Sequence, residues 1–145
     1  MAKIEQSVVI NAPWQMVDSV STDGARLPEW FAGVESVEVT GGFPEVGGKV
    51  DAKYKASGIG FDLVIVSTAY ERGSYLTTSM SGMITGTQHW AINPLSDEQT
   101  ELSVTFDYEV PGGGVGKVLD KLVIERTNKA NIEKSLENLK NLVES

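Results

Sequence analysis

Few side chains in this sequence combine a reactive type with a setting that suits catalysis. His89 is the single histidine and cysteine is absent, which excludes multi-histidine metal sites, thiolate metal sites and thiol nucleophiles. In a strand with Trp90 and Ile92 facing inward, alternation turns His89 outward to solvent. The same alternation turns Asp62 and Asp107 toward water, although both lie in otherwise apolar segments. We therefore predict no metal, no cofactor and no buried catalytic carboxylate.

A glycine-rich run, from Pro111 to Lys117, superficially resembles a phosphate-binding loop. The GxxxxGK[ST] spacing is not met, because Val118 follows Lys117, and a net charge of −8 repels phosphate groups. The same charge argues against nucleic acid binding through a basic patch. Two interpretations of the glycines remain: a flexible hinge that lets the following helix lift and admit a ligand, or a plain strand-to-helix turn.

The residues best suited to a function are large apolar and aromatic side chains that share one face of the predicted strands. Small residues on that face, Ala52, Ala56 and Gly86, leave space for a cavity. The alternative for each large side chain is ordinary core packing. The predicted ligand-binding residues are Trp30, Phe31, Tyr54, Phe61, Leu63, Met80, Gln88, Trp90, Phe106, Tyr108, Leu119, Val123 and Arg126.

Three polar groups in this set have the chemistry to orient a mostly apolar ligand. They are the hydroxyls of Tyr54 and Tyr108 and the amide of Gln88. Arg126 falls on a helical stripe with Leu119 and Val123. If it points inward, we expect it to anchor a ligand carboxylate or carbonyl; the alternative is a solvated charge on the helix surface.

The elements that must position these residues follow from hydrophobic periodicity and from glycine and proline breaks. Alternating strands separated by short turns must pair antiparallel. A final helix over 115–143 would span roughly 40 Å, long enough to cross the sheet. Its second half carries an apolar stripe of Ile132, Leu136, Leu139 and Val143, which predicts core packing. The other predicted elements are strands at 3–10, 34–39, 47–57, 60–71, 73–83, 86–94 and 99–110, and short helices at 13–20 and 24–31.

Length and composition fit one globular domain over residues 1–145. The chain is 41% hydrophobic and 22% charged, values typical of folded domains that are not embedded in a membrane. No apolar run approaches the ~18 residues of a membrane span, and Met1 to Glu5 lack a signal-peptide core. We therefore expect a cytoplasmic protein with no stable membrane insertion.

Several short motifs, in a shared order, resemble a known family. They are Ile10-Asn11-Ala12-Pro13 followed by Val17, then Leu27-Pro28-Glu29-Trp30, Val46-Gly47, Trp90 followed by Pro94, and Ser135-Leu136-Glu137-Asn138-Leu139-Lys140. The chain resembles the polyketide cyclase/dehydrase-like branch of the START (SRPBCC) superfamily. The resemblance implies an α+β helix-grip fold: a seven-stranded curved antiparallel sheet wrapped around a long C-terminal helix, with two short helices after the first strand and a hydrophobic cavity inside.

Function does not follow from this fold, because the superfamily includes carriers, hormone binders, cyclases and ring-hydroxylase domains. The iron ligands of the last group are histidines, and a single histidine speaks against it. We expect binding of a small hydrophobic molecule, lipid, polyketide or isoprenoid-like, in the cavity. One alternative is a cyclase or dehydratase that uses cavity tyrosines or a buried carboxylate. Another is a protein-interaction module with a collapsed cavity and an unidentified protein partner.

Overall fold

Strands and helices account for most of the structure, a computed structural model that describes residues 2–56, 58–82, 84–109 and 121–145. The strands are β1 Ala2–Ile10, β2 Val34–Thr40, β3 Lys49–Ala56, β4 Ile59–Glu71, β5 Tyr75–Gly82, β6 Thr85–Ser96 and β7 Gln99–Glu109. The helices are α1 Trp14–Ser21, a 3₁₀ turn η1 Gly24–Arg26, α2 Leu27–Trp30 and α3 Lys121–Glu144.

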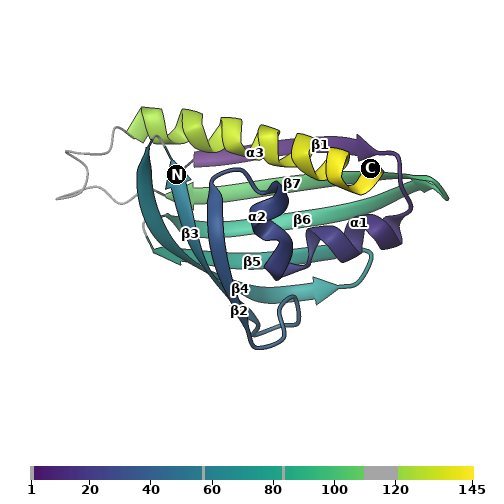
Figure 1. Ribbon diagram of the computed structural model, residues 1–145, viewed down its shortest axis with the longest axis horizontal. Coiled ribbons are helices and arrows are strands. Elements are labelled where there is room, and N and C mark those ends of the chain that lie inside the picture. Colours follow the sequence, from purple (N-terminus) through teal and green to yellow (C-terminus); the bar gives the residue numbers. More distant parts are fainter. Residues whose placement is uncertain (1, 57, 83, 110–120) are drawn as a thin grey trace.

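All strand pairs are antiparallel and form one sheet in the order β1-β7-β6-β5-β4-β3-β2. The two edge strands are therefore β1 and β2, which α1, η1 and α2 connect across one face of the sheet. α3 lies along β1 over the same face, with α1 and α2 beside it (Figure 1). The predicted helix-grip architecture is confirmed, with strand ends within about two residues of those expected.

Two predicted elements differ in detail from the structure. The helix expected over 24–31 is divided into η1 and α2, and Pro28 stands in the first turn of α2, where its missing N–H leaves no hydrogen bond unmade. The long helix begins at Lys121 within the described residues. The expected start at residue 115 and the glycine hinge at 111–117 lie outside the described residues.

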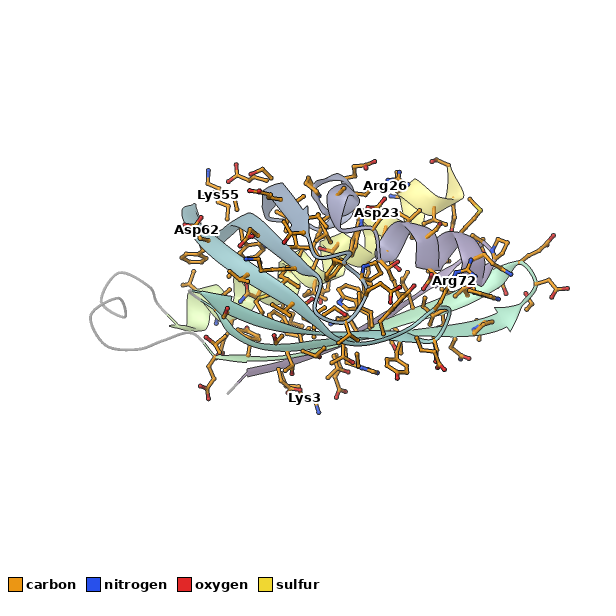
Figure 2. The ribbon with its side chains drawn as sticks, turned by 90° about the horizontal axis from the view of Figure 1, so that it is seen from below. Lys3, Asp23, Arg26, Lys55, Asp62 and Arg72 are labelled. Carbon is orange, nitrogen blue, oxygen red and sulfur yellow. The ribbon has the colours of Figure 1, made fainter. Side chains whose placement is uncertain are left out.

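Burial alternates along the strands as the sequence pattern predicts. In β7, Leu102, Val104, Phe106 and Tyr108 are buried, and the residues between them are partly exposed. On the opposite face, Lys53 and Asp62 form an ion pair of 2.5 Å between side chains that are 66% and 77% exposed. Figure 2 shows the helices on one side of the sheet and Lys3 pointing away from them on the other. The core therefore lies between the inner face and the helices.

Side chains of α3 cover the edge of β1. Lys140 Nζ donates to the carbonyl of Val9 at 2.9 Å, and the backbone N–H of Asn11 donates to Glu144 at 2.9 Å. Lys140 also contacts Glu144 itself. An uncovered edge would offer its backbone groups to another chain, so these bonds both fix α3 and protect the edge. Within the described ranges, no helix has the length and apolar content to cross a membrane.

Candidate functional site

A small cavity lies between the inner face of the sheet and α3. Its volume is about 10 Å³, counted as the space open to the centre of a water-sized sphere, which is about what one water molecule requires. Its walls come from the neighbouring strands β2 to β7, from the segments beside them and from the central part of α3. The lining residues are Phe31, Val34, Tyr54, Leu63, Ile65, Met80, Ile84, Gln88, Phe106, Asn128 and Ile132.

About half of the predicted ligand-binding residues line this cavity. They are Phe31, Tyr54, Leu63, Met80, Gln88 and Phe106. Four more, Trp30, Phe61, Trp90 and Tyr108, are buried but do not line it. Trp90 packs edge-on against Trp30, with ring centroids 5.6 Å apart, and Phe31 joins the same aromatic cluster. Of these three rings, Phe31 lines the cavity, and Trp30 and Trp90 pack against Phe31 without lining it.

The predicted contribution of the early part of α3 is not supported. Val123 is 42% exposed and Arg126 is also exposed. The inward face of α3 passes through Asn128 and Ile132, and at about 100° per residue Arg126 lies roughly 200° away from Asn128. Arg126 is therefore on the opposite side of the helix from the cavity. Leu119, the other member of the predicted stripe, lies outside the described residues.

Gln88 is held in one orientation by a neighbour on its own strand. Trp90 Nε1 donates to Gln88 Oε1 at 3.1 Å, and both side chains are buried. An indole N–H can only donate, so the atom that faces it must be the amide oxygen. The amide nitrogen, Gln88 Nε2, is then left buried, and no described residue accepts a hydrogen bond from it.

Tyr54 joins the sheet to α3 through two asparagines. Its hydroxyl donates to Asn128 Oδ1 at 2.9 Å and accepts from Asn131 Nδ2 at 2.9 Å. Gly33 makes room for this arrangement: its φ is +97°, and a Cβ added there would lie 2.5 Å from the ring of Tyr54. Any larger residue at Gly33 would displace Tyr54 from the two asparagines.

Asn128 is almost fully buried, and its amide nitrogen, near the Tyr108 hydroxyl, makes no hydrogen bond of normal geometry with a described residue. The sequence reasoning missed it, together with Val34, Ile65, Ile84 and Ile132. The signal for Asn128 was present, because it stands one helical turn before Ile132 and so shares its buried face. Its position in a polar stretch, 125–129, concealed that signal.

Most of the described buried polar atoms without a partner belong to the inner face of the sheet or to the side of α3 that faces it. Gln88 Nε2 and Asn128 Nδ2 belong to residues that line it. Thr78 stands opposite Gln88 in the β5–β6 register, and Tyr108 stacks on the lining residue Phe106 with ring centroids 4.6 Å apart. Such orphaned groups are uncommon in folded proteins, and a cluster of them calls for a specific explanation. The full set is Trp30 Nε1, Thr78 Oγ1, Gln88 Nε2, Tyr108 OH and Asn128 Nδ2.

Burial keeps the tyrosines of this region protonated. Burial raises the pKa of Tyr54 to about 12, against a smaller opposite effect of the hydrogen bond from Asn131. Burial also raises the pKa of Tyr108, and a weak, long hydrogen-bonding interaction with the Asn128 side chain lowers it by less. At neutral pH both hydroxyls are therefore donors or acceptors of hydrogen bonds and not bases.

The groups that sequence reasoning excluded from the site lie elsewhere. His89 is on the outer face, where its ring stacks on Tyr75 at 5.8 Å and its Nδ1 lies 2.8 Å from Thr77 Oγ1. Asp62 is exposed on the same face. Within the part of the chain that the structure describes, no three His, Asp or Glu side chains gather as metal ligands would. Among the described residues that line the cavity, none carries a charged side chain.

Comparison with solved structures extends the fold assignment. The Zhui aromatase/cyclase from Streptomyces sp. R1128 has a TM-score of 0.85 at 17% identity, over 99% of this chain and 93% of that chain. A protein from Thermus thermophilus has a TM-score of 0.82 at 21% identity, over 98% and 97%. A START superfamily protein from Mycobacterium smegmatis has a TM-score of 0.80 at 16% identity, over 98% and 97%. At such identities these likenesses show the fold alone.

Comparison by sequence identifies the family. No curated protein matches the chain. A family profile does match, however, and it spans residues 1–144; its description is polyketide cyclase / dehydrase and lipid transport. Since this match covers nearly the whole chain, the chain belongs to the polyketide cyclase / dehydrase and lipid transport family.

Proposed function

We propose that this protein binds a small, mostly apolar molecule in the cavity between the sheet and α3. The observation that carries the proposal is the pair of amide groups, on Gln88 and Asn128, that line an otherwise apolar and uncharged enclosure without a partner in the described part of the protein. Leaving such a group unpaired costs about 1–3 kcal/mol. A ligand that accepts hydrogen bonds from these amides would offset that cost.

A ligand must displace side chains to enter. The cavity of about 10 Å³ has room for one water molecule, so any organic molecule needs more space. Met80 is the lining residue best suited to move, because its unbranched side chain has several rotatable bonds and adapts to irregular shapes. Apolar contact with the displaced walls then stabilises the complex by about 25 cal/mol for each Å² of apolar surface removed from water.

Two competing functions remain, and each has one observation in its favour. A protein-interaction role is favoured by the small volume, since a filled interior leaves the outer surface to act. A cyclase or dehydratase is favoured by the family description and by the aromatase/cyclase among the structural neighbours. Against an enzyme, the lining contains no carboxylate or histidine among the described residues, and the pKa of Tyr54 is raised rather than lowered.

The proposal is tested by following methyl groups during a titration with the apolar dye Nile red. Ile65, Ile84 and Ile132 line the cavity, whereas Ile10 is equally buried but does not. In a protein with labelled isoleucine methyls, we expect saturable shifts in the three lining residues and none at Ile10. This design needs no substitution, so loss of folding cannot imitate a negative result.

Two outcomes would overturn the proposal. One is the absence of binding by Nile red and by other apolar dyes while the methyl spectrum remains that of a folded protein. The other is a set of shifts confined to surface methyls, which would move the function to the outer surface and favour the protein-interaction role.

A further inference from the structure

We propose that the cavity selects neutral ligands that carry a carbonyl-type acceptor oxygen, and that Gln88 and Asn128 set this preference. The inference rests on the proposed function and adds the chemical class of the ligand. It starts from the direction of the unpartnered groups: in both lining residues the amide nitrogen, a donor, has no hydrogen bond with a described residue, whereas the amide oxygen already accepts one.

The direction of Gln88 follows from the chemistry of its neighbour. If the amide turned over, its nitrogen would face Trp90 Nε1, and two donors would meet at the present separation of 3.1 Å. Gln88 cannot therefore turn its amide over without breaking a buried hydrogen bond. Its contribution to the cavity is a fixed donor on β6.

Asn128 supplies a second donor, from the opposite wall. Its oxygen accepts the proton of the Tyr54 hydroxyl, which is itself already accepting from Asn131. The nitrogen of Asn128 lies near the Tyr108 hydroxyl but makes no hydrogen bond of normal geometry with a described residue, and Asn128 is only 1% exposed. One donor on the sheet and one on α3 thus border the same small space, in which a carbonyl oxygen has two lone pairs to accept hydrogen bonds.

The walls also decide the charge of the ligand. The described lining residues include no Lys, Arg or His, so a carboxylate placed among them would have no counter-charge from them. Removing an unpaired charge from water is far more costly than removing a hydrogen-bonded carbonyl. A cationic ligand would also bind weakly, because the unpartnered polar groups of the described lining residues are hydrogen-bond donors.

Three probes that share a naphthalene ring separate the effect of a carbonyl acceptor from the effect of a charge. They are 2-acetylnaphthalene, 2-ethylnaphthalene and 2-naphthoate. Their affinities are measured at neutral pH by competition with Nile red. We expect 2-acetylnaphthalene to bind about three- to tenfold more tightly than 2-ethylnaphthalene for each hydrogen bond gained, and 2-naphthoate to bind most weakly.

The preference should depend on the two amides. In Gln88→Met and in Asn128→Leu, which keep the approximate shape of the side chain, we expect the advantage of the acetyl over the ethyl probe to fall by about threefold or more. Thr78→Val is the matched control: it removes an unpartnered buried hydroxyl directly opposite Gln88 in the sheet, on a residue that does not line the cavity. In this control the preference should be unchanged.

An infrared measurement gives a second readout that does not depend on variants. The carbonyl band of 2-acetylnaphthalene bound to the unaltered protein should lie at lower frequency than in an apolar solvent, because a hydrogen-bonded carbonyl is weakened. If Gln88→Met fails to fold, the frequency of this band and the probe affinities of Asn128→Leu still test whether the amides bind the ligand carbonyl.

The possible results distinguish the two proposals. Equal affinity for the acetyl and ethyl probes, with Nile red still bound inside, would refute the selection of carbonyl ligands. It would mean that water alone satisfies the two amides, and the proposed function would stand. Failure of every probe to bind a folded protein would refute both proposals.

Discussion

Thr78 and Thr100 are chemically identical side chains in opposite situations. Both are buried, but Thr100 Oγ1 donates to the carbonyl of Ala12 at 2.9 Å, whereas Thr78 Oγ1 has no partner among the described residues. A buried hydroxyl with a partner contributes to stability, and one without a partner costs it. The inner face of the sheet therefore holds side chains of both kinds, and the unpartnered ones stand around the cavity.

Replacing these threonines by valine should have opposite effects on the free energy of unfolding. We expect Thr78→Val to stabilise the protein by about 1 kcal/mol or more, because it removes an unpaired hydroxyl and keeps the β-branched shape. Thr100→Val should destabilise it by about 1–3 kcal/mol, since it leaves the Ala12 carbonyl without its donor. Urea denaturation of both variants measures the difference. Equal destabilisation would show that water already pairs with Thr78.

Tyr54 makes stability depend on pH in the alkaline range. An unfolded tyrosine ionises at a pKa near 10, whereas burial raises the folded pKa of Tyr54 to about 12. The stabilisation from this group is therefore complete below pH 10 and is lost as the pH rises through 12. Within that window the free energy of unfolding should fall by roughly 1.4 kcal/mol per pH unit for this group.

Near-ultraviolet absorbance of the phenolate follows the ionisation directly, and Tyr54→Phe provides the control. The variant should lose the step at highest pH and show a shallower fall of stability with pH; some slope remains because the pKa values of Tyr70 and Tyr108 are also raised. If a tyrosine instead ionised below about pH 8, and Tyr54→Phe abolished that step, the site would be tuned for proton transfer and the enzyme proposal would replace binding.

At the scale of elements, α3 does more than cover the sheet. Ser135 Oγ, fully buried, accepts from the backbone N–H of Ala32 at 2.8 Å, and Asn138 Nδ2 donates to the carbonyl of Trp30 at 3.2 Å. The connection between α2 and β2 is thereby held against α3. Phe31 and Val34 line the cavity from this connection and from the start of β2. Polar residues of one helix thus position apolar walls that belong to another segment.

Ser135→Ala should loosen this wall. The Ala32 N–H would lose its acceptor, and we expect a loss of about 1–3 kcal/mol in the free energy of unfolding. Hydrogen exchange at Ala32 should accelerate more than at amides in the centre of the sheet. Glu137→Ala is a suitable control, because that side chain is 63% exposed on the same helix and its ion pair is long, at 3.9 Å. Uniform acceleration in both variants would contradict a local role for Ser135.

The sequence predicted elements more accurately than orientations. Alternation in β7 and the stripe from Ile132 to Val143 identified buried faces correctly, because each pattern repeats over several residues. The stripe of Val123 and Arg126, which we expected to line the cavity, is instead exposed to solvent. Over so few residues, apolar periodicity did not determine which side of the helix meets the sheet. The position of Asn128, a polar residue on the buried face, is the information that was missing.

At the scale of the whole molecule, the order of strands and helices was sufficient to predict the architecture. Short turns impose antiparallel pairing, and a long helix must bury its apolar face on the sheet. The volume of the cavity was not predictable in the same way. It is the small difference between the space that the sheet and α3 enclose and the space that their side chains fill, so shifts of a few tenths of an ångström change it greatly. Which polar atoms remain unpaired depends on the same fine geometry.

The pairing of β1 with β7 also sets the timing of events during synthesis. Ala2 lies opposite Tyr108 and Ile10 opposite Thr100, so β1 has no strand to pair with until β7 has been translated. At the usual pace of a ribosome, that interval lasts several seconds. Throughout it, the inward side chains Ile4 and Ile10 have no core to join, and the strand is open to pairing with other nascent chains. For this protein, completing the sheet is a late step of translation, because β1 stays unpaired until β7 has been made.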